Sequence, residues 1–382
     1  MSRLNGNGTG PGGATPPGAL VVAEGLEVVI LNENEVLVQR GTRSTPSELL
    51  RDTELRGFLG PVMARLREAP RTVDELAAAV PPEDAGEVRE LLDGLRQSGF
   101  VVPAGTGLLD GYLAYAFEGA RPLADRSVAL LGAGPLGARI AAGLLQHGVG
   151  RVTLLDDRPA DGVWRRFVPF AGTGEPDGRP ACALLAERLQ ALGHGPARVQ
   201  AGAPTTDTVA LERAIGQADL AIVAFERPQL RLTQRVNRVC VRDERPWLLA
   251  GIDGNVALAG PLFVPPHTAC YNCFRTLADA SVPNAEMAER YRRHLAAGRG
   301  ASFFPGLPAH ADLAAGYATL AAAHFLARGT AFLVGRALFL DFGDMSLDLE
   351  DVLVLPRCPV CARTRPAYEP AFAPRVVQAV GV

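Results

Sequence analysis

Lysine is absent from this 382-residue chain, in which all 38 basic residues are arginines. No reaction that needs a lysine amine, whether as a nucleophile or as a phosphate ligand, can therefore use this chain's own side chains. With 41 acidic residues the formal net charge is only −3. So small a charge gives no general attraction to nucleic acid or to an anionic membrane.

Long apolar runs are also missing. No stretch approaches the ~18 uninterrupted apolar residues that a membrane-spanning helix needs. Residues 1–19 are rich in Gly, Pro and Thr and have no apolar core segment of the kind found in secretory signals. We expect these residues to form a disordered tail and the protein to be cytoplasmic, where cysteine pairs more often indicate metal or redox sites than disulfides.

The pattern of residues 20–105 predicts a first domain. Two strand-like runs flank residues 32–35 as a hairpin, and helical spacing covers residues 49–66, 72–79 and 83–98 before a strand at 100–102. Thr72 and Glu75 have the spacing of a capping box. Strands combined with tandem helices are typical of a winged helix-turn-helix. The third helix is acidic, which does not suit contact with DNA phosphates.

A glycine-rich turn opens the second domain, residues 106–382. The strand-like run 126–131 leads into Gly132, Gly134 and Gly137, a helical pattern follows, and the next strand ends at Asp156. This β–α–β order predicts a Rossmann-like parallel sheet, with the turn near phosphates and the aspartate near a ribose. The same glycines would also permit close helix–strand packing, so the turn alone leaves the nucleotide chemistry open.

Four cysteines form two Cys-x-x-Cys pairs, Cys270 with Cys273 and Cys358 with Cys361. Four thiolates are the ligand set of a closed structural Zn²⁺ site, which has no open position for catalysis. The long separation between the pairs means that such a metal would join distant segments. The alternative is two redox pairs or unligated core thiols. Cys182 and Cys240 lie among apolar neighbours and are expected to be packing residues.

The glycine turn, the aspartate and the two cysteine pairs together resemble the ThiF/MoeB adenylyltransferases, relatives of ubiquitin-activating enzymes. The segments 150–156 and 269–273 are especially similar to that family, and the resemblance covers roughly residues 120–275 plus the second cysteine pair. It implies an α/β, Rossmann-like ThiF/MoeB-type fold with a four-cysteine zinc site. It further implies an ancestral activity in which ATP adenylates a carboxyl terminus.

The chain departs from that family at the residues that would handle ATP. The family's lysine position reads Ala181, so the positive charge that stabilises the transition state is missing. The asparagine–arginine segment aligns with Arg165 and Arg166, where an arginine is kept and the asparagine is lost. Where the family has a metal-binding aspartate, this chain offers only Glu226, at a displaced position. We therefore expect a vestigial nucleotide site at Gly132, Gly134, Gly137 and Asp156, no ATP use and no catalytic residue.

A degenerate ThiF/MoeB-type domain behind a winged helix-turn-helix resembles the ocin-ThiF-like proteins, or F proteins. The resemblance implies a non-catalytic adaptor that binds the leader of a ribosomally made precursor peptide. Its partner would be a separate YcaO-type cyclodehydratase that forms thiazoline or oxazoline rings. The peptide would add a strand to the edge at residues 41–49. Its expected contacts are Arg40, Arg43, Val88, Leu91, Leu92 and Leu95, although those apolar side chains could equally be the domain's own core.

Three other functions fit parts of the sequence. The first is an active adenylyltransferase of a carrier protein or peptide C-terminus, which would keep the family's chemistry. The second is a transcriptional regulator that uses the winged domain on DNA. The third is an oxidoreductase that uses the glycine turn to bind a dinucleotide. The missing lysine disfavours the first, and the acidic third helix disfavours the second. The lack of residues suited to positioning a nicotinamide disfavours the third. We expect no nucleic-acid or membrane partner, and the resemblance implies a possible homodimer.

Overall fold

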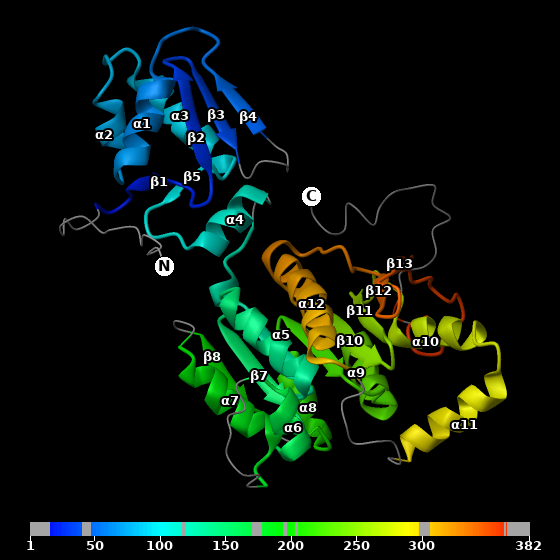
Figure 1. The fold of residues 1–382 in the computed structure, drawn as a ribbon. Coiled ribbons are helices and arrows are strands. Elements are labelled where there is room, and N and C mark those ends of the chain that lie inside the picture. The colour runs from blue at the N-terminus through cyan, green and yellow to red at the C-terminus, as the bar shows by residue number, and fades with distance from the viewer. Residues whose placement is uncertain are drawn as a thin grey trace. The chain divides into compact units, whose positions relative to one another are not determined.

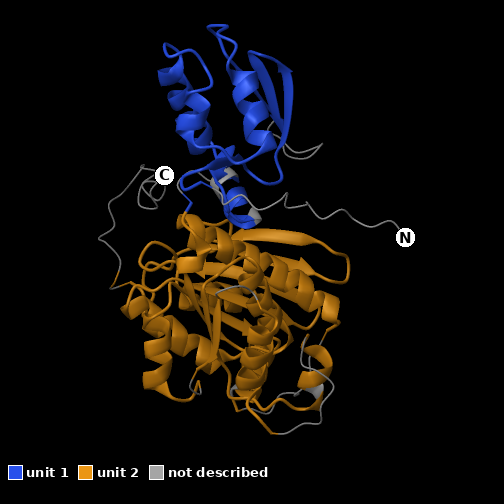
Figure 2. Ribbon diagram, turned by 90° about the vertical axis from the view of Figure 1, so that its left-hand side faces the viewer, with its two compact units in different colours: residues 1–120 blue, residues 121–382 orange. Residues whose placement is uncertain are grey.

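The computed structural model describes residues 16–39, 47–116, 120–169, 178–193, 197–202, 205–297, 306–362 and 364. The chain divides into two compact units, residues 1–120 and 121–382 (Figure 2). The division falls after the expected boundary at residue 105, because helix α4 (Leu108–Ala116) groups with the first unit. Most of the expected tail, residues 1–15, lies outside the described residues.

The first unit combines two small sheets with helices (Figure 1). The hairpin of β2 and β3 is as expected, and β4 extends it to the order β2-β3-β4, while β1 pairs antiparallel with β5. The capping box of Thr72 and Glu75 is formed at the start of α2. The remaining bounds are β1 Leu20–Val22, β2 Glu27–Asn32, β3 Glu35–Gln39, β4 Ser47–Arg51, α1 Leu59–Glu68, α2 Val73–Ala77, α3 Ala85–Gln97 and β5 Val101–Pro103.

One helix of this unit differs from its prediction. Residues 49–66 have helical apolar spacing, yet Leu49 and Leu50 belong to strand β4 and pair with β3, and α1 begins only at Leu59. Between them Gly57 has a φ of +77°, a left-handed conformation that ends regular structure. Its amide donates to the side chain of Asn34 at 2.6 Å. Pairing with β3 therefore overrides the local helical pattern.

The second unit is built on one eight-stranded sheet of order β13-β12-β11-β10-β9-β6-β7-β8. The strands β10, β9, β6, β7 and β8 are parallel, and β11 to β13 continue the sheet antiparallel. The strands are β6 Ser127–Leu131, β7 Arg151–Leu155, β8 Arg198–Ala201, β9 Leu220–Phe225, β10 Trp247–Asp253, β11 Val256–Phe263, β12 Arg336–Asp341 and β13 Leu347–Asp351. The α/β class and the large Rossmann-like sheet are thus confirmed.

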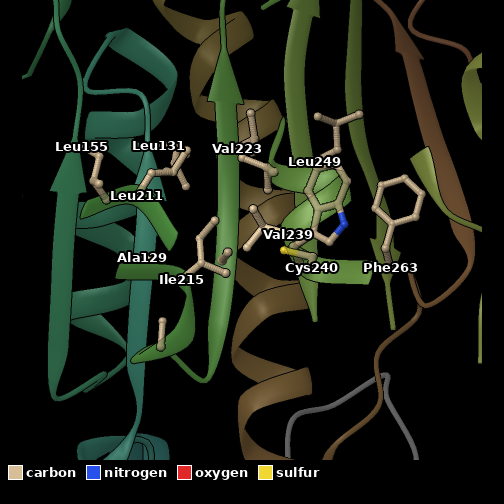
Figure 3. Packing of buried hydrophobic residues seen from close by; sticks show 14 of the residues in the cluster. Ala129, Leu131, Leu155, Leu211, Ile215, Val223, Val239, Cys240, Leu249 and Phe263 are labelled. Atoms are coloured by element: carbon tan, nitrogen blue, oxygen red, sulfur yellow. The ribbon is translucent and has the colours of Figure 1, made fainter. Parts of the chain in front are cut away.

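Helices cover this sheet and close its core (Figure 1). They are α5 Pro135–Gln146, α6 Gly162–Phe167, α7 Ala181–Ala191, α8 Thr208–Gly216, α9 Leu230–Arg242, α10 Tyr271–Ala280, α11 Ala285–Ala296 and α12 Pro308–Arg328, with a short 3-10 turn at Leu123–Asp125. Figure 3 shows β6, β7, β9 and β10 contributing Leu131, Leu155, Val223 and Leu249 to one apolar cluster. Because central parallel strands are covered on both faces, they consist of nearly unbroken apolar residues.

The parallel strands also create a switch point. The chain runs outward from β6 through β7 to β8 and then returns to β9 on the other side of β6. In such sheets the loops at the carboxyl ends of the two strands beside the switch separate and leave a crevice. Among the described residues, no helix is both long and apolar enough to cross a membrane.

Candidate functional site

The glycine turn joins β6 to α5 at this switch point. Gly132 has a φ of +115°, and a Cβ atom there would overlap the carbonyl oxygen of Ala224 on β9. A Cβ at Gly137 would overlap the carbonyl oxygen of Gly132. Both glycines are therefore required by the close approach of β6, β9 and α5, whether or not a nucleotide binds.

Asp156, directly after β7, accepts hydrogen bonds from other groups of the protein. It is 8% exposed, and its Oδ2 accepts from the backbone N–H of Ala133 in the glycine turn at 2.6 Å. Its Oδ1 accepts from the backbone N–H of Arg158 at 2.9 Å, and the Arg158 guanidinium donates to the same carboxylate at 2.7 Å. Asp156, from which we expected a hydrogen bond to a ribose, thus links the glycine turn to Arg158.

Glu226, just after β9, lies against the first turn of α5. The residue is 5% exposed, and its Oε1 accepts from the backbone N–H of Leu136 at 2.9 Å. A Cβ at Gly134 would lie 2.7 Å from the Glu226 carboxyl carbon, so this carboxylate would have to shift if residue 134 had a side chain. The positive end of a helix favours an anion, and here that anion is a carboxylate of the chain itself.

Arg158 connects the two carboxylates. Besides Asp156, its guanidinium contacts Glu226 Oε2 at 3.3 Å, while 45% of its side chain remains exposed. Burial acts to lower the pKa of Arg158, but the charges of both carboxylates and the hydrogen bonds to them outweigh it and raise that pKa. Arg158 is therefore a permanent cation between two buried anions.

A cavity of about 380 Å³ lies beside this cluster at the carboxyl ends of β6, β7 and β9. Its walls include Leu131, Val223 and Trp164, and the Trp164 indole N–H donates to the carbonyl of Ala133 at 2.6 Å. The charged residues that line it are Asp156, Asp157, Asp161, Glu226, Arg158 and Arg227. Four carboxylates against two guanidinium groups make the lining acidic.

The positions compared with the family's lysine and arginine bring no positive charge into this cavity. Ala181 is fully buried at the start of α7. Arg166 is exposed, with its guanidinium 5.5 Å from the ring centroid of Phe167. Neither Arg165 nor Arg166 is among the described residues that line the cavity. The cationic groups needed to neutralise a triphosphate are thus missing from the positions where the resemblance places them.

The four predicted metal ligands come together. Cys270, Cys273, Cys358 and Cys361 are all buried, and their sulfurs lie within 4.8 Å of one another. The separations are 4.0 Å for Cys270–Cys273 and 3.6 Å for both Cys270–Cys358 and Cys273–Cys361. A tetrahedral site with Zn–S bonds of about 2.3 Å requires sulfurs about 3.8 Å apart. The cluster therefore fits a four-thiolate metal ion and joins the start of α10 to the segment after β13.

Two neighbouring N–H groups support this cluster. The side-chain amide of Asn272 donates to Cys358 Sγ, and the backbone N–H of Leu355 donates to Cys273 Sγ, both at 3.5 Å. Donation from the Cys270 thiol lowers the pKa of Cys273. Such N–H···S contacts stabilise thiolates and orient metal ligands. Cys182 and Cys240 are buried elsewhere and lie outside the cluster.

The residues expected to contact a leader peptide differ in how far the structure leaves them exposed. Arg40 and Arg43 lie outside the described residues. Val88, Leu92 and Leu95 are 0%, 0% and 3% exposed in the first unit's own core, so they offer almost no surface to a peptide. Leu91 is only partly buried and packs against the same core. The expected contact face of α3 is thereby reduced to Leu91.

The sequence pattern predicted no role for Arg158 and related Glu226 only to the family's metal-binding aspartate, from which it is displaced. Arg158 stands two residues after Asp156, and a cation that close to a strand-end carboxylate was the available signal. The pairing with Glu226 joins segments far apart in the chain, and only the sheet order brings them together. The contact of Trp164 with the glycine turn likewise joins distant segments, and the sequence carried no signal for it.

These features define a Rossmann-like α/β unit with a carboxylate-filled glycine turn and a four-cysteine cluster, preceded by a smaller unit. No protein-family model matches the chain, and no curated protein matches it either. Solved structures do match it. The microcin C7 biosynthetic enzyme MccB in complex with N-formylated MccA aligns with a TM-score of 0.62 and 17% identity, over 90% of this chain and 99% of that chain.

Two further structures show the same fold. MccB of E. coli with ATP has a TM-score of 0.62 and 16% identity, over 90% of this chain and 99% of that one. The heterocyclase TruD has a TM-score of 0.58 and 17% identity, over 90% of this chain but only 43% of TruD. At these identities the likeness establishes a shared fold.

Proposed function

We propose that this chain is a non-catalytic adaptor in the modification of a ribosomally made peptide. It would bind the leader of the precursor and present it to a separate YcaO-type, ATP-dependent cyclodehydratase that forms thiazoline or oxazoline rings. The observation that carries the proposal is Ala181, buried and uncharged where the resemblance requires lysine, within an otherwise similar scaffold. The fold likeness to MccB, solved with N-formylated MccA, and to the heterocyclase TruD supports a peptide substrate.

The first unit is the proposed peptide-binding domain, of winged helix-turn-helix type. Among its described strands, β4 pairs only with β3, which leaves its other edge open. The amide of Asp52 donates to the carbonyl of Asn34, next to β3, at 2.8 Å. Because backbone groups alternate along an antiparallel strand, Leu50 also faces β3, while Leu49 and Arg51 present their N–H and C=O groups at the open edge. This edge can accept an extended peptide as a further strand.

Side chains beside that edge would then select the peptide. Leu49 is 41% exposed on the outer face of the sheet, whereas Leu50 turns inward and is partly buried against the unit's core, as Leu91 is. Alternate residues of an added strand would lie beside Leu49 on one face and beside Leu50 on the other. We therefore expect a leader with apolar residues at alternate positions.

The test uses the full chain and a fluorescein-labelled leader peptide of the precursor encoded beside its gene, followed by fluorescence anisotropy. Leu49→Pro removes an outward N–H without removing a bond to β3, and Leu49→Ala is the matched control that keeps the N–H. We expect proline to weaken binding at least tenfold and alanine about threefold or less, since the backbone carries the contact. Equal binding by the two variants, or no binding by the folded wild-type chain, contradicts the proposal.

The four-cysteine cluster is proposed to hold one structural Zn²⁺. Its four thiols satisfy the metal's full coordination number, so no position is left for a substrate or a reactive water. The bound ion would fasten the segment after β13 to α10, and hence to the main sheet. Its role is to stabilise the scaffold.

An active adenylyltransferase is the alternative, favoured by the fold likeness to MccB solved with ATP and by Gly132 and Asp156 at the expected places. It predicts ATP–pyrophosphate exchange by this chain when a peptide or carrier C-terminus is supplied. Exchange above the background of a boiled sample would favour this alternative over the adaptor. Its absence, with leader binding intact, favours the adaptor.

A further inference from the structure

We propose that the Glu226 carboxylate is a built-in occupant of the phosphate position at the glycine turn, and that with Arg158 it excludes nucleotides from the cavity. This inference deepens the proposed adaptor function, because it states what replaces the nucleotide in a fold that holds one elsewhere. It rests on the hydrogen bonds of the turn, on the burial of two carboxylates and on the charges of the cavity lining.

Two N–H groups of the turn are already used by carboxylates of the chain. That of Ala133 donates to Asp156, and that of Leu136 donates to Glu226. Pro135, the first residue of α5, has no N–H at all. A phosphate at the start of a helix is held mainly by such backbone donors. To bind here it would have to displace a buried carboxylate from Leu136.

Charge opposes the same exchange. A phosphate group in this position would lie against Glu226, which is 5% exposed, and near Asp156, which is 8% exposed. Like charges in a poorly hydrated site repel strongly. Arg158 is the cation in contact with both carboxylates, and it would have to leave one of them to serve a phosphate. The residues present therefore do not fit ATP.

A simpler reading is that Glu226 is only a cap for α5. Both readings predict that removing the carboxylate destabilises the unit, because the helix loses a favourable anion. They differ in what the vacated space does. A mere cap leaves no affinity behind, whereas a phosphate substitute leaves a glycine turn whose Leu136 N–H and Arg158 guanidinium can receive an added anion.

The experiment compares the wild-type full chain with Glu226→Ala and Glu226→Gln by isothermal titration with inorganic pyrophosphate, ATP with Mg²⁺, and adenosine. Glu350→Ala is the control for net charge, because Glu350 is exposed on β13, far from the turn in the sheet order. We expect Glu226→Ala to bind pyrophosphate and ATP at least tenfold more tightly than wild type, which is about 1.4 kcal/mol. Glu226→Gln should gain less, because the amide still fills the space, and Glu350→Ala should gain nothing.

Two results overturn the inference. One is wild-type binding of ATP as tight as that of Glu226→Ala. The other is no gain by either folded Glu226 variant, with folding verified by circular dichroism; should the alanine variant not fold, the nearly isosteric glutamine variant decides alone. Anisotropy with the leader peptide on the same samples keeps the two proposals apart, since a gain in nucleotide binding supports the inference whether or not the leader binds.

Discussion

Arg158→Ala should lower the free energy of unfolding of the second unit by about 2 kcal/mol. The substitution removes the cation that bridges Asp156 and Glu226, whose side chains are only 6% and 5% exposed. Those carboxylates then keep their backbone donors, Ala133 and Leu136, but lose the cation that contacts both of them. A buried anion that loses its partner retains the cost of its lost hydration, which is the source of the destabilisation.

The magnitude follows from the exposure of the three groups. Breaking a fully buried ion pair from one side costs about 3–5 kcal/mol. Because 45% of the Arg158 side chain is exposed, water screens part of the attraction, and we take about half of that range. Arg179 provides a matched control, since it is 44% exposed and pairs with Glu187, which is itself 56% exposed. Arg179→Ala should cost less than about 0.5 kcal/mol.

The assay is urea denaturation followed by tryptophan fluorescence. The chain has only two tryptophans, Trp164 and Trp247, and both lie in the second unit, so the signal reports that unit alone. Arg158→Lys, which keeps the charge but loses the two-pronged geometry, should fall between wild type and alanine. If Arg158→Ala and Arg179→Ala unfold at the same free energy, the bridging role assigned to Arg158 is wrong.

Two further substitutions test the scaffold. Cys358→Ser should abolish the binding of one zinc ion per chain, measured by metal analysis of the purified protein, while Cys182→Ser should leave the metal content unchanged; equal metal content in both would disprove the four-thiolate site. Gly132→Ala should cost more than about 3 kcal/mol, because it combines an unfavourable φ with overlap against Ala224. Gly162→Ala, where nothing lies within 4 Å of the added atom, should be nearly neutral, and similar melting temperatures for the two would contradict the packing argument.

The features that the sequence predicted well are those that depend on short segments. A central parallel strand must be apolar on both faces, so the run ending at Leu131 is recognisable without knowledge of its neighbours. Two Cys-x-x-Cys pairs identify four ligands because thiolate chemistry, not fold, dictates the spacing within each pair. The cysteine cluster and the turn at Gly132 were therefore both expected before any tertiary structure was known.

The features that it did not predict depend on contacts between distant segments. Leu49 and Leu50 have helical spacing to the residues after them, but their pairing with Leu37 and Val36 decides for a strand. On α3, an apolar stripe shows that Val88 is buried but not by what, and its own unit's core covers it. Local pattern specifies that a face is apolar, and only the tertiary arrangement specifies its partner.

The proposed role of Glu226 would explain how a fingerprint motif and a binding activity can separate. A helix that starts at a glycine turn carries a partial positive charge and unpaired N–H groups, and it is more stable when an anion lies there. A bound phosphate meets that need only when nucleotide is present, whereas Glu226 meets it in the free protein, with Arg158 compensating the added charge. The turn can then keep Gly132 and Gly137 for packing alone. It follows that the stability of the second unit should not depend on ATP, and that the glycines are needed for the fold even in a chain that binds no nucleotide.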